Sequence, residues 1–215
     1  MNEKKKLDLE ALEKTFEYLK SSTHEDVPGV VCIDSGKPGP TVGVTVCTHG
    51  NEPAGLAAAK HLLSDDFKLK KGKLYIVCNN LQATQEYFNS LKNGGASHEA
   101  RGSGANMNRL PPGIMRRELG DDDPYEYKRA QQLEPIWKQF TGGGMDIHTT
   151  SADAGTMSFL DAYQAEVCQD AVKQLPVEFL LHDIDTHLYG ELVTSFYGLY
   201  AATNDLRFSV MHVTS

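Results

Sequence analysis

The hydrophobic positions along the chain follow two different periods. Across residues 7–20, apolar residues recur near one face of a helix, and the polar run Ser21-Ser22-Thr23 ends it. Residues 41–47 are instead largely β-branched and apolar, and residues 73–78 are strongly apolar, which predicts two buried strands. The segment between them, residues 53–63, has the composition of a helix with Pro53 in its first turn.

This order of strand, helix and strand predicts a parallel sheet with right-handed crossovers. Further helices are expected at 125–140 and 162–173, and further strands at 144–148, 177–181 and 207–213. With 215 residues and ordinary apolar and charged fractions, the chain can bury one sizeable core. We therefore expect an α/β fold in a single domain over residues 1–215.

A long irregular stretch, residues 92–124, interrupts the predicted elements. It is rich in glycine, asparagine, proline and charge, and it shows neither the helical nor the alternating period. Because ordered loops of this length inside a compact domain are usually functional, we expect it to line the active site.

The composition excludes several classes of protein. The formal net charge is -8 without a basic stripe, which argues against a nucleic-acid partner. No run of about eighteen apolar residues exists, and the charged first residues lead into an amphipathic segment, so we expect no membrane insertion and a cytoplasmic location. The four cysteines lack Cys-x-x-Cys spacing and are expected to be buried, reduced thiols. The oligomeric state stays open, a homo-oligomer included.

Metal-ligating side chains occur at the ends of two predicted strands. Thr48-His49-Gly50-Asn51-Glu52 follows one strand, and Asp146-Ile147-His148 ends another. Two imidazoles and one carboxylate are a recurring ligand set of catalytic zinc, which keeps a fourth position for water. Ligands of open α/β sheets bind outside the carboxyl ends of the strands. We therefore expect His49, Glu52 and His148 to bind Zn2+, with Asp146 accepting a hydrogen bond from an imidazole. The rival cluster, His182-Asp183-Ile184-Asp185-Thr186-His187, needs a turn for its histidines to converge.

Polar residues in the long loop indicate a second part of this site. Arg101 is followed there by Asn108-Arg109. A guanidinium beside zinc can stabilise a carbonyl oxygen that gains charge, or it can clamp a carboxylate through two parallel hydrogen bonds. The alternative is that these residues are solvated and form surface ion pairs with the aspartates at 121–123.

The motifs at residues 48–52 and 146–148, together with Arg101 and Asn108-Arg109, resemble the aspartoacylase and succinylglutamate desuccinylase family, a branch of the zinc carboxypeptidase superfamily. The resemblance lies in order, spacing and residue type. It implies a zinc-carboxypeptidase-like α/β fold with a mixed, mostly parallel sheet flanked by helices. It also implies His49, Glu52 and His148 on zinc, Arg101 as the catalytic residue on the scissile carbonyl, and Asn108 with Arg109 on the substrate carboxylate.

The chain also departs from the family pattern. Asn80-Leu81 stands where the family commonly has Asn-Pro, and Asn106 stands where the family has an aspartate. The family's catalytic glutamate would fall near Ser209-Val210-Met211-His212-Val213, which contains none. Another group such as Glu191 or His212 could shuttle the proton, the chain could be shortened, or the protein could bind zinc and small acids without turnover. The smaller β-rich C-terminal region of the relatives is expected to be lacking.

The expected activity is zinc-dependent hydrolysis of the amide bond in a small N-acyl amino acid or a related carboxylate-bearing amide. Zinc would lower the pKa of its bound water and polarise the carbonyl, while Arg101 would stabilise the oxyanion. One alternative is a metallocarboxypeptidase acting on peptides, which a roomy cleft would favour. Another is a non-catalytic homologue that binds zinc or small acids.

Overall fold

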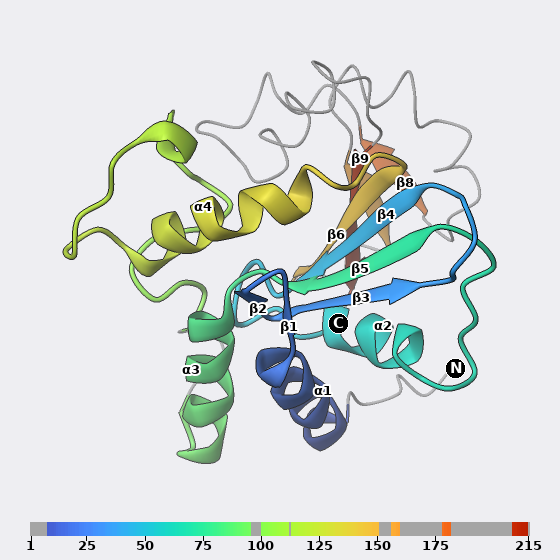
Figure 1. The fold of residues 1–215 in the computed structure, drawn as a ribbon. Helices are drawn as coiled ribbons and strands as arrows, with labels where there is room; N and C mark the ends of the chain where they lie inside the picture. The colour runs from blue at the N-terminus through green and yellow to red at the C-terminus, as the bar shows by residue number, and fades with distance from the viewer. Residues whose placement is uncertain are drawn as a thin grey trace.

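A seven-stranded mixed sheet forms the centre of the protein (Figure 1). The computed structural model describes residues 8–95, 100–111, 113–150, 156–159, 178–181 and 208–214. The strands of the sheet are β3 (Val30–Asp34), β4 (Thr41–Val46), β5 (Lys73–Cys78), β6 (Gly143–Thr150), β7 (Met157–Phe159), β8 (Phe179–Leu181) and β9 (Phe208–Thr214). They lie in the order β3-β5-β4-β6-β9-β7-β8. A separate hairpin pairs β1 (Thr23–His24) with β2 (Val27–Pro28).

The sheet is mostly parallel at its centre and antiparallel toward its edges. The adjacent strands β5, β4, β6 and β9 run in one direction, so their carboxyl ends share one edge of the sheet. β3 is antiparallel to β5, whereas β7 is antiparallel to β9 and parallel to β8. This topology confirms the expected α/β class with a mixed sheet. It also provides the edge at which such sheets bind ligands.

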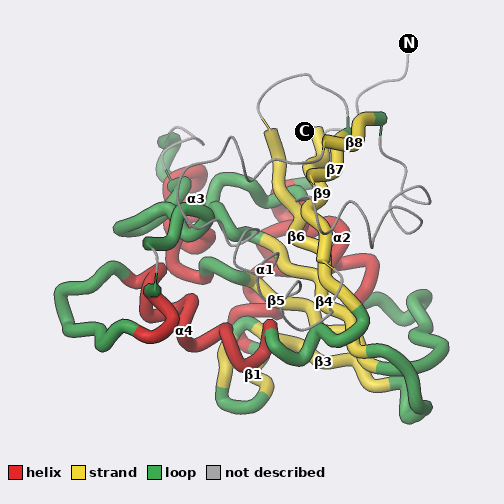
Figure 2. Tube along the Cα trace, turned by 90° about the horizontal axis from the view of Figure 1, so that it is seen from above, coloured by secondary structure: helices red, strands yellow, loops and turns green. Residues whose placement is uncertain are grey.

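Helices cover both faces of the sheet (Figure 1). α1 (Leu9–Ser21), α2 (Gly55–Leu62) and α3 (Leu81–Lys92) pack on one face, and α4 (Tyr125–Trp137) packs on the other. Figure 2 shows the same sheet from above, with the strands between these helices. Side chains of β5 alternate between the two cores, because Tyr75 and Val77 face α4 while Leu74 and Ile76 face the other helices. Among the described helices, none is both long and apolar enough to cross a membrane.

Local sequence explains where the helices begin and which faces they bury. The buried apolar residues of α1 follow helical spacing: Leu12, Phe16 and Leu19. Asp8 caps α1 and Asn80 caps α3, each by accepting a hydrogen bond at its side-chain oxygen from the backbone N–H three residues later. The Asn80 cap starts α3 directly after β5, at the carboxyl edge of the sheet.

The central elements agree closely with the sequence-based prediction. The strands expected at 41–47, 73–78, 177–181 and 207–213 correspond to β4, β5, β8 and β9, with shifts of a residue or two at their ends. The helices expected near residues 7, 53 and 125 correspond to α1, α2 and α4. The helix expected at 162–173 lies outside the described residues.

Other elements were not predicted, and α3 shows the reason. Its buried side chains are Ala83, Thr84, Tyr87 and Phe88. Because half of this stripe is small or polar, the helical period is weak in the sequence. The strands β1, β2 and β7 carry too few residues to show an alternation of their own, and the five residues of β3 do not alternate between buried and exposed positions. The described part of the 92–124 loop holds only one short 3-10 helix, Ile114–Arg116, as expected of an irregular stretch.

Candidate metal centre

The candidate metal ligands lie at the carboxyl edge of adjacent parallel strands. His49 and Glu52 belong to the turn between β4 and α2, and His148 lies near the end of β6. β4 and β6 are paired so that Val46 lies opposite Ile147. This register brings the turn after β4 beside His148, although the two segments are remote in sequence. The structure thus places the three residues together.

The turn that carries His49 and Glu52 depends on an unusual backbone. Cys47 has a φ of 55°, in the left-handed region that non-glycine residues rarely adopt. At Gly50 a Cβ atom would lie 2.2 Å from the carbonyl oxygen of Ala83 and 2.5 Å from that of Ala100, so only glycine fits. The Gly50 N–H donates to the Arg101 carbonyl at 3.3 Å. The turn is therefore packed tightly against α3 and the long loop.

Glu52 lies between the two imidazoles. One of its carboxylate oxygens is 2.7 Å from Nδ1 of His49, and the other is 2.8 Å from Nδ1 of His148. The backbone N–H of Thr149 donates to the same carboxylate at 3.0 Å. One potential ligand atom from each of the three residues lies within 4.8 Å of the others, and all three residues are buried. This is a compact N,N,O donor set with the composition that divalent zinc accepts.

The far side of His148 is held by a buried carboxylate. Nε2 of His148 lies 2.7 Å from Asp146, which has no exposed surface. Asp146 also accepts hydrogen bonds from the hydroxyls of Thr45 (2.6 Å) and Thr48 (2.9 Å). The Asn79 amide donates in turn to the Thr48 hydroxyl at 2.7 Å. This network fixes the ring so that Nδ1, rather than Nε2, points toward Glu52.

The far side of His49 is held by an amide. Nε2 of His49 lies 3.0 Å from the side-chain oxygen of Asn106, and the same oxygen accepts the backbone N–H of Asn108 at 2.8 Å. Because both Nε2 atoms have acceptors behind them, both Nδ1 atoms are left on the Glu52 side. The donor set therefore fits a divalent cation held by two Nδ1 atoms and the Glu52 carboxylate.

The charges of the group favour an ionised Glu52 and a protonated His148. Burial works against the charged form of His148, but the charges and hydrogen bonds of Asp146 and Glu52 outweigh it and raise its pKa to about 10. Burial likewise opposes the charge of Glu52, yet both histidines hold the pKa of that carboxyl well below its usual range. Burial lowers the pKa of His49 despite Glu52. A bound cation would take the place of the protons on Nδ1.

Arginine side chains lie beside this buried group. The Arg101 guanidinium is half-exposed and donates to Glu52 at 3.1 Å. Arg109 donates to the carbonyl of Asn108 at 2.6 Å, and burial together with the charge of Arg101 lowers its pKa. The two guanidinium groups are therefore close enough to repel each other electrostatically beside the candidate metal centre.

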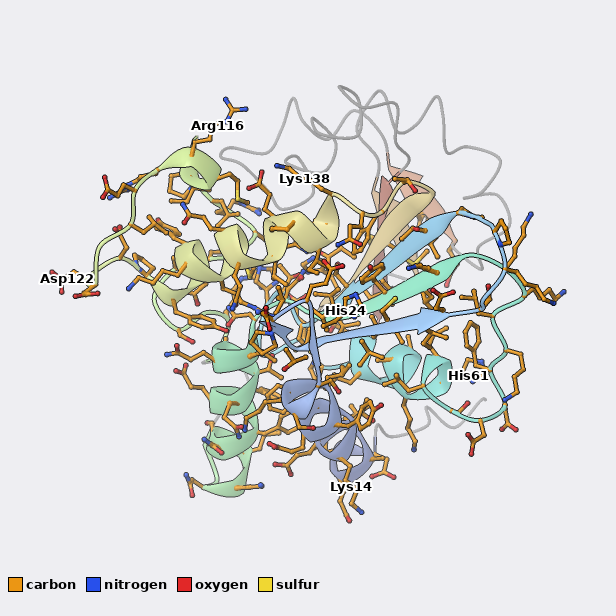
Figure 3. The ribbon with its side chains drawn as sticks, in the orientation of Figure 1. Lys14, His24, His61, Arg116, Asp122 and Lys138 are labelled. Carbon is orange, nitrogen blue, oxygen red and sulfur yellow. The ribbon has the colours of Figure 1, made fainter. Side chains whose placement is uncertain are left out.

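The alternative of surface pairing with the aspartates at 121–123 does not describe these arginines. Asp123 pairs instead with Arg117, at 3.1 Å. Asp122 points away from the sheet at the far end of the loop (Figure 3). Arg101 makes its ion pair with Glu52.

Sequence reasoning missed several buried polar residues of this region. Thr45 donates directly to Asp146, and Asn79 is connected to Asp146 through the hydroxyl of Thr48. Glu126 of α4 contacts the loop that carries Arg101. Their partners lie far away in sequence, so no local spacing marks them. His212 is in register with His148 on the neighbouring strand β9. Glu191 and the cluster at 182–187 lie outside the described residues.

Comparisons with known proteins find a matching family model and similar solved structures. The family model of the succinylglutamate desuccinylase/aspartoacylase catalytic domain matches residues 38–190. Murine aminoacylase 3 is similar in structure, with 22% identity and a TM-score of 0.58 over 82% of this chain and 56% of that one. The succinylglutamate desuccinylase of Chromobacterium violaceum gives 19% identity and a TM-score of 0.62, over 87% of this chain and 60% of that one. An aspartoacylase family protein of Mesorhizobium loti gives 17% identity and a TM-score of 0.63, over 86% of this chain and 55% of that one.

The chain spans little more than half the length of these three proteins, between 55% and 60%. At these identities the structural likeness shows the fold. No curated protein sequence matches the chain.

Proposed function

Because the chain belongs to the succinylglutamate desuccinylase/aspartoacylase family of hydrolases, we propose that it is a zinc-dependent hydrolase of the amide bond in a small N-acyl amino acid or a related carboxylate-bearing amide. The observation that carries this proposal is the buried group of His49, Glu52 and His148 with a half-exposed arginine against it. A bound zinc ion supplies a water activated for attack near neutral pH and a Lewis acid for the scissile carbonyl.

The residues of the chain prepare this chemistry by orientation and charge. Asp146 and Asn106 hold the two imidazoles with their Nδ1 atoms toward Glu52, so the ligand set is formed before a cation binds. Burial excludes bulk water from the group, which strengthens every electrostatic interaction inside it. Both features favour a preorganised hydrolytic site.

Arg101 has the position required for stabilising charge on a reacting oxygen. Its guanidinium contacts Glu52 from the exposed side, so it lies within reach of a carbonyl brought to the metal. Removing a donor of this kind typically lowers kcat by about 10²- to 10³-fold. We assign to Arg101 the role of stabilising negative charge on the scissile carbonyl oxygen.

Asn108 and Arg109 supply the recognition of a carboxylate. Arg109 is exposed and carries a planar donor fork, and Asn108 is joined to Asn106 through its backbone N–H. A small substrate with a free carboxylate would thus be held at one end by this pair and at the other by the metal. This arrangement favours an N-acyl amino acid as the substrate class.

The test is hydrolysis by zinc-loaded protein of N-acetyl, N-succinyl and N-formyl amino acids, measured by release of the free amine. Arg101→Met is expected to lower kcat by about 10²- to 10³-fold, whereas Arg109→Met is expected mainly to raise KM. Arg116→Met is the matched control, because Arg116 lies on the same loop and points to solvent (Figure 3). Turnover that survives both a chelator and Glu52→Ala would reject the zinc assignment.

A second candidate function, binding without turnover, rests on β9. This strand lies beside β6 at the site, and residues 208–214 contain no glutamate to act as the family's general base. Stoichiometric zinc and tight binding of N-acetyl amino acids, without amine release from any of the three substrate classes, would favour this candidate over hydrolysis.

A further inference from the structure

Glu126, in the first turn of α4, is buried in an unusual way. Its side chain has no exposed surface, and the described residues provide it with no lysine or arginine partner. Instead it accepts hydrogen bonds from the Asn80 amide (3.1 Å) and from the backbone N–H groups of Ser103 (2.6 Å), Gly104 (3.4 Å) and Ala105 (3.0 Å). Every contact is a donor, which matches an ionised carboxylate.

The loop from Arg101 to Asn106 is folded closely around this carboxylate. A Cβ atom at Gly102 would lie 2.1 Å from the carbonyl oxygen of Ala105 and 3.3 Å from the nearer oxygen of Glu126. Consecutive backbone N–H groups of the loop therefore converge on one anion that the protein itself supplies. A single carboxylate thus fixes three successive residues of an otherwise irregular segment.

Both ends of the same loop reach the candidate metal centre. At one end, Arg101 donates its side chain to Glu52 and accepts the Gly50 N–H at its carbonyl. At the other end, Asn106 accepts from His49 and from the Asn108 N–H. Among the described residues, Glu126 bonds neither to the ligands nor to the arginines. It acts on them through the loop and through Asn80, whose backbone N–H donates to the Cys47 carbonyl at the start of the ligand turn.

We propose that Glu126 is a positioning residue, whose buried carboxylate holds loop 101–109 so that Arg101 faces the metal centre and the scissile carbonyl, while Arg109 binds the carboxylate of the substrate. The proposal rests on the proposed function for the identity of the bound anion. Its structural part, the control of the loop by Glu126, is independent of that identity. Burying a carboxylate away from water is unfavourable unless its acceptors are filled, so the four donors and the anion depend on each other.

Glu126→Gln is the sharpest substitution, because it keeps the shape and removes one acceptor. The amide oxygen can replace one carboxylate oxygen only, and the new NH2 group then faces N–H donors of the loop. Glu134→Gln is the matched control: Glu134 lies in the same helix, but it pairs with Lys138 at the surface. Gly102→Ala is a second variant that disturbs the contact from the loop side and leaves α4 intact.

The first readout needs neither substrate nor metal. Trypsin cleavage of the native protein after Arg101, followed by mass spectrometry, is expected to be at least about tenfold faster in Glu126→Gln and in Gly102→Ala, because cleavage of a held loop follows its opening equilibrium. Glu134→Gln is expected to match the wild type. If Glu126→Gln does not fold, Gly102→Ala carries the test alone.

The second readout separates positioning from general destabilisation. The calorimetric affinity of zinc-saturated Gly102→Ala for N-acetyl-L-aspartate is expected to fall at least about tenfold. Its zinc affinity, measured by competition with a chromophoric chelator, is expected to fall by a smaller factor, because all three ligands remain and only the Asn106 contact behind His49 is loosened. Arg129→Gln is the control for stability, since Arg129 ties the same helix to backbone carbonyls of Asn79 and Cys78 and makes no contact with the loop.

The outcomes divide cleanly. The positioning role would be overturned if trypsin cleavage after Arg101 and the affinity for N-acetyl-L-aspartate were both unchanged in Glu126→Gln and in Gly102→Ala. Equal losses of affinity in Gly102→Ala and Arg129→Gln would overturn it as well, because instability alone would then explain them. A third outcome is faster cleavage in the variants together with a wild-type protein that binds no N-acetyl amino acid. That result would support the control of the loop by Glu126 and would reject the proposed substrate class instead.

Discussion

At the scale of single residues, the two candidate imidazole ligands differ in what stands behind them. His148 is backed by the Asp146 carboxylate, whereas His49 is backed by the neutral Asn106 amide. A carboxylate behind an imidazole raises its basicity and fixes its orientation more strongly than an amide does. The Asp146 contact could be predicted, because Asp146 and His148 alternate on one strand. The Asn106 contact could not, because it joins His49 to a residue far along the chain.

This asymmetry predicts opposite effects of two isosteric substitutions on zinc affinity. Asp146→Asn should weaken zinc binding by about 10- to 100-fold, the usual range for such outer contacts, because the amide cannot serve all of its donors. Asn106→Asp should strengthen zinc binding, because His49 then faces a carboxylate that can still accept from Asn108. Competition with a chromophoric chelator measures both. Weaker binding by Asn106→Asp would show that the amide is required there.

At the scale of elements, the site depends on how β4 passes into α2. The sequence order of strand, glycine turn and helix was sufficient to predict this unit, since β4 is β-branched and Gly50 follows it. The contacts that hold the turn were not predictable. The turn packs against the start of α3 and against the loop at Ala100, and neither segment has a strong hydrophobic period in the sequence. The missed helix α3 is thus part of the wall behind the ligands.

Gly50→Ala is therefore expected to lower the free energy of unfolding by about 1–3 kcal/mol, the range for overpacking a tight site, and to weaken zinc binding at the same time. The added Cβ would lie 2.2 Å from a backbone carbonyl oxygen that cannot move without α3. Gly120→Ala is the control, since a Cβ there meets nothing within 4 Å. It should change stability by no more than about 0.5 kcal/mol. Urea denaturation compares the two variants, and equal stabilities would contradict the tight packing of the turn.

At the scale of the whole molecule, the sequence predicts the centre of the sheet better than its margins. β4, β5 and β6 are recognisable by composition, and with them the edge where His49 and His148 meet. The pairings of β3 with β5 and of β9 with both β6 and β7 join segments that are far apart in sequence or reversed in direction. Such strand pairings depend on the packing of the complete sheet, so the local hydrophobic pattern of the sequence does not predict them.

The same long-range arrangement predicts that zinc stabilises the fold as a whole. Its candidate ligands come from the β4–α2 turn and from β6, so a bound cation would tie together segments that separate on unfolding. A ligand that binds only the native state adds about 4 kcal/mol when its free concentration is 1,000 times Kd. Zinc should therefore raise the melting temperature, and a chelator should reverse the increase.

His148→Ala should abolish this zinc-dependent increase in melting temperature, because it removes one ligand and leaves the other two. His61→Ala is the control, since His61 is exposed on α2 (Figure 3) and does not belong to the group of His49, Glu52 and His148. Thermal melts followed by circular dichroism, with zinc and with chelator, measure each variant against itself, which cancels the stability cost of the substitution. A zinc-dependent shift of the same size in His148→Ala and in the wild type would place the cation elsewhere in the molecule. It would leave the carboxyl edge of β4 and β6 without its assigned ion.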